Sequence, residues 1–541
     1  MNINLRTVEG NASAASTTAS HAGLRLRYLC YAALVAVVIL FAVIRIRLRT
    51  MPLERDEGEY VYAGQLMLEG IAPYRLAYNM KLPGTYAAYA ALMAVFGQSV
   101  TGIRLGMLLV NATTMLLVFL LGRRLFGVLA GTVAAATYAL LSNRTSMFAL
   151  DGHATHFVAL AAVAGTLLLL QALDTRRKSL LFASGLLYGL AFLMKQPGIL
   201  FGVFGMSYWL WSERRASERR KLISGAAALS AGIALPLLCT CILLWHAGVF
   251  EGFWFWTYSY GREYGALTSF SAGWGLFRKI VPWIVRPFVI WGLAAFGLSA
   301  VLWSPAARKW RVFLVGFLGF SFLAVCPGLY FRSHYFLVML PAVALLAGVG
   351  IEAAREKLVA HGKLAAALPS IFFALTFVTV IYGHRKFLFE MSPADVAERV
   401  HAGDGCAEAE SVAGYIEQHT TRQDAIAVLG SEPEIYFYAR RHSATGYIYM
   451  YGLMEQQKFA QRMQAEMIGQ IEAARPRFLV YTDDELSWGW STPGAEKDRL
   501  FDWMRRYLDA SYGLAATIPI NGVAQHRWGT QPAFYIFELR Q

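Results

Sequence analysis

Repeated apolar runs of roughly 16–24 residues constrain the fold of this chain more than any other feature. A helix needs about 20 apolar residues to cross the hydrocarbon core of a bilayer, so these runs predict a multi-pass membrane protein. The composition agrees, because 57% of the 541 residues are hydrophobic and only 16% are charged. Two soluble domains with large cores would have shorter, amphipathic runs. The predicted spans, about eleven in all, are 28–44, 100–121, 127–142, 157–173, 180–194, 197–211, 222–245, 281–303, 312–326, 335–350 and 364–382.

The basic residues between these runs predict the orientation of the chain. Lys and Arg cluster in every second loop, and cytoplasmic loops carry such an excess of positive charge. All clusters are cytoplasmic only if the N-terminus is inside and the C-terminus is outside. The sequence therefore predicts the bacterial cytoplasmic (inner) membrane, with the C-terminal region periplasmic or otherwise extracytoplasmic. The clusters are Arg123-Arg124, Arg176-Arg177-Lys178, Arg214-Arg215 with Arg219-Arg220-Lys221, Arg308-Lys309 with Arg311, and Arg355, Lys357 and Lys363.

One basic group disagrees with this orientation. Arg45, Arg47, Arg49 and Arg55 follow the first span and would lie outside. A separate purpose for such an outer patch is the binding of anionic lipid phosphates. The formal net charge of +14 does not indicate nucleic acid, because most of the Lys and Arg lie in the short loop clusters. The five cysteines provide neither a disulfide framework nor a metal-type spacing.

The chain divides into three predicted regions. Residues 1–27 are a polar cytoplasmic tail, and the span after them lacks a cleavage site, so it is retained. Residues 28–389 form a transmembrane module with a first outer loop at 45–99, in which 83–96 is too short to span and is expected to lie at the outer interface. Residues 390–541 form a small extracytoplasmic α/β domain. Its expected strands are 425–429, 478–481, 515–520 and 533–538, and its helices lie near 407–419, 454–474 and 496–509.

Polar residues far apart in the sequence gather at the predicted outer face, and ionisable groups against a membrane are retained mainly for function. The acidic loop Asp56-Glu57-Gly58-Glu59 is the densest group. Adjacent carboxylates repel, so one of them is expected to keep a raised pKa and act as a base near neutral pH. The same oxygens suit a divalent cation such as Mg²⁺ or Mn²⁺. The simplest alternative is an acidic first turn of a helix over 60–69.

Short motifs along nearly the whole chain carry a family resemblance. In the first outer loop they are Arg-Asp-Glu-Gly-Glu-Tyr (55–60), Leu-Glu-Gly-Ile-Ala-Pro-Tyr (68–74) and Tyr-Asn-Met-Lys-Leu-Pro-Gly (78–84). Later motifs are 192–197, 332–341, 425–433 and 436–441. Together they resemble the GT-C glycosyltransferases that use polyprenyl-phosphate sugars, in the bacterial family 39 branch related to protein O-mannosyltransferases and aminoarabinose transferases. Two positions depart from that pattern: Leu82 replaces the first Pro of Lys-Pro-Pro, and Glu59 replaces an Arg of the aminoarabinose transferases.

The resemblance implies an enzyme that moves a sugar from a polyprenyl-phosphate carrier to an acceptor hydroxyl on the outer face, with inversion. Asp56 is the implied general base, and Glu57 and Glu59 would orient it or, for Glu57 with Asp56, hold a metal. A divalent cation is the one cofactor left open. The acceptor is a glycan, a lipid or a protein, and the chain also contacts membrane lipids. The implied donor-phosphate ligands are Lys81, Lys195, Arg332 and His334, and the implied substrate contacts are Tyr60, Tyr74, His153, His156, Tyr260, Arg262 and Glu263.

Several of these residues have simpler interpretations. Lys195 at a helix end is equally consistent with snorkelling to the interface. The predicted loop 254–264 is rich in aromatic residues, which is consistent with an interfacial belt. The loop Gly430-Ser431-Glu432 follows a strand end, where α/β sheets place ligands, but it also fits an ordinary turn. At the level of function, the alternatives are a transporter or flippase of lipid-linked saccharides, and a non-catalytic envelope assembly protein.

Overall fold

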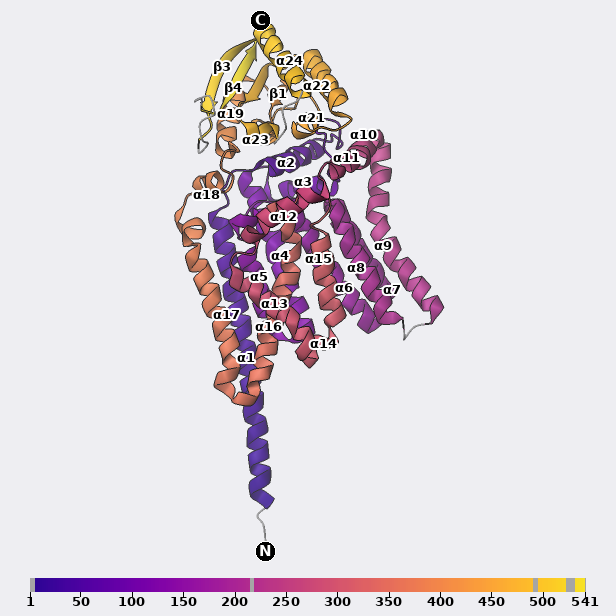
Figure 1. Ribbon diagram of the computed structural model, residues 1–541, viewed down its shortest axis with the longest axis vertical. Coiled ribbons are helices and arrows are strands. Elements are labelled where there is room, and N and C mark those ends of the chain that lie inside the picture. The colour runs from indigo at the N-terminus through magenta and orange to yellow at the C-terminus, as the bar shows by residue number, and fades with distance from the viewer. Residues whose placement is uncertain (1–4, 215–217, 490–494, 522–530, 541) are drawn as a thin grey trace.

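The structure is a computed structural model that describes residues 5–214, 218–489, 495–521 and 531–540. Residues 1–4 of the predicted tail and Arg215 of the third basic cluster lie outside the described residues. The predicted fold class is confirmed: apolar helices form one elongated body, and a small domain with a four-stranded sheet lies at one of its ends (Figure 1).

Each predicted span lies on one helix, except 197–211, 281–303 and 335–350, which each cover parts of two elements. In the part of the chain that the structure describes, six helices are long and apolar enough to cross a membrane, or seven if one bent pair counts as a single span. The others are shorter because the chain turns early at Gly, Pro or polar residues. The helices are α1 (Leu5–Arg47), α4 (Val100–Phe126), α5 (Val128–Leu141), α6 (Ala154–Thr175), α7 (Lys178–Met194), α8 (Ile199–Glu213), α9 (Arg219–His246), α13 (Phe288–Trp303), α15 (Arg311–Leu323), α16 (Leu340–Leu358) and α17 (Lys363–Gly383).

Small residues let these helices approach closely, which is how helices associate where lipid removes the hydrophobic drive. A Cβ added at Gly185 of α7 would lie 2.3 Å from the carbonyl oxygen of Leu229 in α9. The reverse contact is equally tight, since a Cβ at Gly232 of α9 would lie 2.2 Å from the carbonyl oxygen of Phe182. Glycine at both positions is therefore needed for the α7–α9 contact.

One predicted span in the membrane module is wrong. The span 281–303 is broken, because α12 (Phe270–Ile284) and α13 meet at an angle of 104°. Pro287 stands at the break, and proline lacks the N–H that would continue a helix. The tail 1–27 is helical from Leu5 and continues directly into the first span. The remaining short elements are η1 (Thr145–Met147), η2 (Gln196–Gly198), α14 (Pro305–Lys309), η4 (Ser333–Met339), η5 (Val359–His361) and η6 (Lys386–Glu390).

Most of the basic residues after the first span bind carbonyl or carboxylate oxygens of the same chain. Their predicted role in lipid-phosphate binding is therefore wrong for all but one of them. Arg45 is buried and donates to the carbonyl oxygens of Leu150 at 2.9 Å and Ala149 at 2.6 Å. Arg47 donates to the carbonyl oxygen of Leu388 at 3.2 Å. Only Arg49 is exposed, and Arg55 is buried in an ion pair described below. Backbone carbonyl groups that lack a helical partner thus explain why arginines lie at this end of α1.

Short helices cover the end of the bundle that faces the small domain (Figure 1). They include α2 (Arg55–Leu68) and α3 (Gly84–Phe96), the latter at the position predicted for an interfacial helix. The aromatic segment is not a loop as predicted. It is helical throughout, as α10 (Phe250–Trp254), the π-helix η3 (Phe255–Tyr260) and α11 (Gly261–Ala266).

The C-terminal domain contains a mixed sheet in the order β1-β2-β4-β3. Strands β1 (Ile426–Leu429) and β2 (Phe478–Thr482) are parallel, with Ile426 opposite Phe478. β4 (Ala533–Leu539) is antiparallel to β2 and to β3 (Tyr512–Pro519). The predicted helix 454–474 begins only at residue 460. The helices are α18 (Pro393–Val400), α19 (Cys406–His419), α20 (Glu434–Ala439), α21 (Tyr451–Met454), α22 (Ala460–Ala474), α23 (Glu485–Trp488) and α24 (Ala495–Ser511).

Candidate active site

A cavity of about 250 Å³ lies between the C-terminal domain and the helix ends of the membrane module that face it. Both parts of the chain line it. The membrane module contributes α2, the segment 78–81, the α7–α8 turn and the residues before α16, and the C-terminal domain contributes residues 447–455 and Met463. The predicted site residues on its wall are Asp56, Tyr60, Lys81, Lys195, Tyr260, Arg332 and His334.

Asp56 lies in the first turn of α2, and its position follows from the helix cap. The carboxylate of Glu54 accepts hydrogen bonds from the backbone N–H groups of Asp56 at 2.9 Å and Glu57 at 2.8 Å. Glu54 therefore caps the helix, so Asp56 is free to face the cavity. There it pairs with the ammonium of Lys81 at 2.9 Å, and His334 Nε2 lies 3.9 Å from its second oxygen. Its side chain is 14% exposed.

The raised pKa predicted within the acidic loop is not at Asp56. Burial alone would raise the pKa of Asp56, but Lys81 and the nearby His334 hold it well below its usual range. Burial instead raises the pKa of Glu57 and of Glu59, against the lowering effects of Arg104 and Lys81 respectively. Asp56 is consequently ionised at neutral pH.

Glu59 is buried behind Asp56 and fixes Lys81 in place. One of its oxygens accepts from Lys81 at 2.7 Å and from Asn79 at 2.7 Å, and the other accepts from the Tyr86 hydroxyl at 2.5 Å. Lys81 therefore bridges two carboxylates and is less free to bind a phosphate than the sequence suggested.

Glu57 faces away from the cavity. It accepts from Arg104 at 2.6 Å and from the backbone N–H of Gly152 at 2.6 Å, so it does not share a metal with Asp56. Arg104 was missed in the sequence. The available indication was its position inside an apolar span, where an unpartnered charge is costly. This pair ties α2 to α4 and to the loop before α6.

Two cations face the cavity without an acidic partner among the described residues. The ammonium of Lys195 lies 3.8 Å from the centre of the Tyr335 ring, and Arg332 stacks over Tyr330 at 5.8 Å. Burial lowers the pKa of Lys195 to about 7, and Lys81 and Arg332 add to this effect. An anion beside these two side chains would stabilise their positively charged forms. The turn Gln196–Gly198 presents Lys195, since Pro197 interrupts the run of helix.

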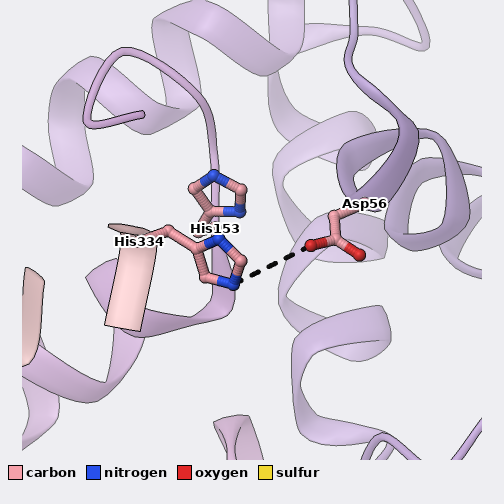
Figure 2. A group of neighbouring side chains, drawn as sticks. All are labelled: Asp56, His153 and His334. Carbon is pink, nitrogen blue, oxygen red and sulfur yellow. Dashed lines mark ion pairs between the residues drawn. The ribbon is translucent and has the colours of Figure 1, made fainter. Parts of the chain in front are cut away.

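Asp56, His153 and His334 form the one group among the described residues that offers three ligand atoms for a metal ion, all within 4.8 Å of one another. Figure 2 shows the two imidazoles stacked and Asp56 opposite them; their ring centres are 4.1 Å apart. Neither nitrogen of His153 has a hydrogen-bond partner. Two imidazoles and one carboxylate suit zinc or another transition metal better than Mg²⁺. A metal here would take ligands from His153 and His334 instead of Glu57.

The remaining predicted residues lie around the cavity and not on it. The Tyr74 hydroxyl donates to the backbone carbonyl of Lys81 at 2.8 Å, which shapes the segment that carries this lysine. His156 is buried in α6. Arg262 is exposed, and Glu263 pairs with Lys458 at 2.5 Å.

The C-terminal domain reaches the site through residues that were not predicted. The hydroxyl of Tyr449 lies 3.5 Å from Asp56. Arg55, next to Asp56, pairs with the fully buried Glu432 at 3.0 Å and donates to the Tyr451 hydroxyl at 2.7 Å. The loop 430–432 is therefore neither an exposed ligand loop nor a plain turn, because its glutamate anchors this domain on α2. Nothing near Tyr449 or Tyr451 in the sequence marked them, since only the fold brings them to Asp56.

Part of the chain matches a known protein family. Residues 81–245 match the family described as dolichyl-phosphate-mannose-protein mannosyltransferase. The chain is similar to the undecaprenyl phosphate-alpha-4-amino-4-deoxy-L-arabinose arabinosyl transferases of Pseudomonas aeruginosa (strain UCBPP-PA14), at 29% identity over 271 residues, and Pseudomonas paraeruginosa, at 30% over 273. Each match covers 47% of this chain and 46% of the relative, so it spans about half the length of these relatives.

The whole fold is similar to that of two solved membrane proteins. ArnT from Cupriavidus metallidurans bound to undecaprenyl phosphate has a TM-score of 0.56 at 16% identity, covering 93% of this chain and 97% of that one. The archaeal oligosaccharyltransferase AglB from Archaeoglobus fulgidus, in complex with an inhibitory peptide and a dolichol-phosphate, has a TM-score of 0.51 at 12% identity, covering 92% and 74%. At these identities the likeness establishes the fold. The chain thus shares its fold with ArnT and AglB, and part of its sequence is similar to the mannosyltransferase family and to the arabinosyl transferases.

Proposed function

We propose that this protein transfers a sugar from a polyprenyl-phosphate carrier to an acceptor hydroxyl at the extracytoplasmic face of the membrane. The observation that carries the proposal is one cavity lined by an ionised carboxylate, Asp56, and by two cations, Lys195 and Arg332, that form no ion pair among the described residues. A glycosyl phosphate needs both, because a proton leaves the acceptor while charge develops on the leaving phosphate. The relatives named for undecaprenyl-phosphate aminoarabinose support the same donor class.

The reaction is an inverting single displacement. The acceptor oxygen forms a bond to the anomeric carbon as the bond from that carbon to the phosphate oxygen breaks. The polyprenyl phosphate leaves with the bonding electron pair, and the acceptor proton passes to Asp56. A carboxylate held at low pKa by Lys81 is a weak base, so it receives this proton late, once the attacking oxygen has become acidic. Lys81 and Glu59 fix the carboxylate in position for that transfer.

Lys195 and Arg332 hold the phosphate and stabilise the charge that it gains as it departs. Both come from loops at the outer helix ends, where a lipid headgroup in the membrane can reach the cavity. Lys81 takes a smaller part in this binding, since it already pairs with two carboxylates.

A transporter or flippase for lipid-linked saccharides fits less well. Such proteins place broken helices and charged groups near the middle of the bilayer. In this chain the charged groups of the site lie at one end of the bundle, beneath the C-terminal domain (Figure 1). A non-catalytic assembly protein would need neither the capped Asp56 nor the free Lys195.

Envelope glycans test the proposal directly. Cells that lack the protein should lose one sugar modification, detectable as a mass difference of one glycosyl residue on a lipid, glycan or protein. Wild-type protein should restore it, and Asp56→Asn should not, although the variant reaches the membrane at the same level. Restoration by Asp56→Asn would refute the assignment of the base. An unchanged glycan profile in the deleted strain would refute the function.

A further inference from the structure

The cavity has a second carboxylate that the reaction does not use. Glu455 follows α21 in the C-terminal domain and lines the cavity together with Asp56 and Arg332. The hydroxyl of Tyr260 donates to one of its oxygens at 3.1 Å. Among the described residues no other side chain donates to this carboxylate, and no cation forms an ion pair with it. A partly buried carboxylate with a single neutral donor has unfilled acceptor capacity.

The electrostatic surroundings of Glu455 point in the same direction. Burial raises the pKa of Glu455 to about 7, and neither Tyr260 nor Arg332 offsets this rise fully. Arg332 lowers the pKa of both Glu455 and Asp56, so both carboxylates lie within electrostatic range of this arginine. A group that donates hydrogen bonds to Glu455 from inside the cavity would stabilise its ionised form.

Aromatic side chains surround this part of the cavity. Tyr260 and Trp256 pack edge to face at 5.4 Å, and Tyr264 stacks on Tyr330 at 4.7 Å. Trp256, Tyr260 and Tyr264 all line the cavity. Flat apolar rings beside an acceptor-only carboxylate suit a sugar ring, which presents C–H faces and donor substituents at its edge. They also suit a cationic amino group, since aromatic faces attract cations.

We infer that Glu455 belongs to the subsite for the transferred sugar and accepts hydrogen bonds from a hydroxyl or ammonium substituent of that sugar. This inference rests on the proposed function, because it takes a polyprenyl-phosphate sugar as the ligand. The C-terminal domain thereby contributes to sugar specificity, while the membrane module holds the phosphate. Glu455 is distinct from the groups expected at the phosphate, so its replacement should affect the sugar-bearing lipid alone.

The test compares three lipids on purified full-length protein: undecaprenyl phosphate, undecaprenyl phosphate bearing 4-amino-4-deoxy-L-arabinose, and undecaprenyl phosphate bearing a neutral hexose. The Kd of each is measured for wild type, Glu455→Gln and Glu455→Asp, with Glu485→Gln as an exposed control in the same domain. Glu455→Gln should bind undecaprenyl phosphate as wild type does and bind at least one sugar-bearing lipid about tenfold more weakly, the usual cost of one hydrogen bond to a charged group. The control should bind all three lipids like wild type.

The lipids for which Glu455→Gln loses affinity identify the sugar substituent that donates the hydrogen bond. A loss confined to the amino sugar assigns an ammonium partner, and similar losses for both sugars assign a hydroxyl. Equal weakening of undecaprenyl phosphate itself would overturn the inference, as would wild-type affinity of Glu455→Gln for both sugar-bearing lipids. If wild type binds none of the three lipids, the proposed function fails and the inference with it. If wild type binds them all but attached sugar adds nothing to affinity, only the inference fails.

Discussion

At the scale of single residues, neighbours decide which carboxylate and which lysine can take part in the reaction. The motif that contains Asp56, Glu57 and Glu59 was visible in the sequence, but their division of labour was not. Lys81 lowers the pKa of Asp56, so this carboxylate stays ionised. Burial raises the pKa of Glu59, which supports Lys81, and Glu57 forms an ion pair with Arg104. Those partners are 22 to 47 positions away along the chain, so only the fold determines them.

Lys195 should give the binding of polyprenyl phosphate a pH dependence. Its pKa in the free protein is lowered to about 7, so above that pH the protein must take up a proton in order to bind an anion there. The Kd for undecaprenyl phosphate should therefore rise about tenfold per pH unit between pH 7 and 9. In this window a phosphate monoester is already largely in its doubly charged form, so the slope reports the protein.

Two replacements of Lys195 distinguish the effect of its charge on binding from the effect of its size. Lys195→Arg keeps its proton throughout the range and should flatten the pH profile, whereas Lys195→Met should bind weakly at every pH. An unchanged slope in Lys195→Arg would show that another group titrates. The neighbouring His153 has its pKa lowered to about 4 by burial, so it does not contribute between pH 7 and 9.

At the scale of elements, the contact between α2 and the C-terminal domain places the tail-domain residues over the cavity. Gly58 allows this contact, since an added Cβ would lie 2.5 Å from the backbone nitrogen of Glu434 in α20. Glu432 completes it: one oxygen accepts from Arg55, and the other accepts from Thr482 at 2.6 Å and Ser487 at 2.9 Å. The hydrophobic pattern predicts the strands, and the basic clusters are visible in the sequence itself. A contact between residues 55 and 432 could not be predicted from either.

Glu432→Gln should therefore destabilise the protein far more than Glu434→Gln. The first change removes one partner of a buried ion pair, which costs roughly 3–5 kcal/mol. Glu434 makes a matched control, because it is buried in the same contact but neither of its carboxylate oxygens has a hydrogen-bond partner for the amide to disrupt. The midpoint temperature of unfolding and protease cleavage of the C-terminal domain measure the difference. Equal effects of the two variants would mean that the Arg55–Glu432 pair does not hold the domain.

At the scale of the whole molecule, the hydrophobic pattern and the loop charges predicted most of the architecture, because a bilayer imposes length and polarity on every span. The break between α12 and α13 escaped prediction, since a bent pair and a single long span have the same composition. The helical form of residues 250–266 also escaped, because closely spaced aromatic residues show no clear helical period.

Fusion reporters test the orientation on which the site assignment depends. Alkaline phosphatase, which is active only outside the cytoplasm, should be active when fused after residue 98, because α3 does not cross the membrane. It should be inactive when fused after residue 126, beyond α4. The opposite pair of results would place the acidic loop and the cavity on the cytoplasmic side.

In the proposed reaction, Asp56 accepts the proton in a direct displacement from a polyprenyl-phosphate sugar. Sugar transfer by purified wild type and Asp56→Asn tests this role, with both proteins bound to the same sugar-bearing undecaprenyl phosphate and membrane extract as the source of acceptor. The product of wild type should have the opposite anomeric configuration to the donor. Asp56→Asn should bind the donor and yet transfer the sugar at least about a hundredfold more slowly. Transfer at the wild-type rate by Asp56→Asn, or a product with retained configuration, would contradict the proposed reaction.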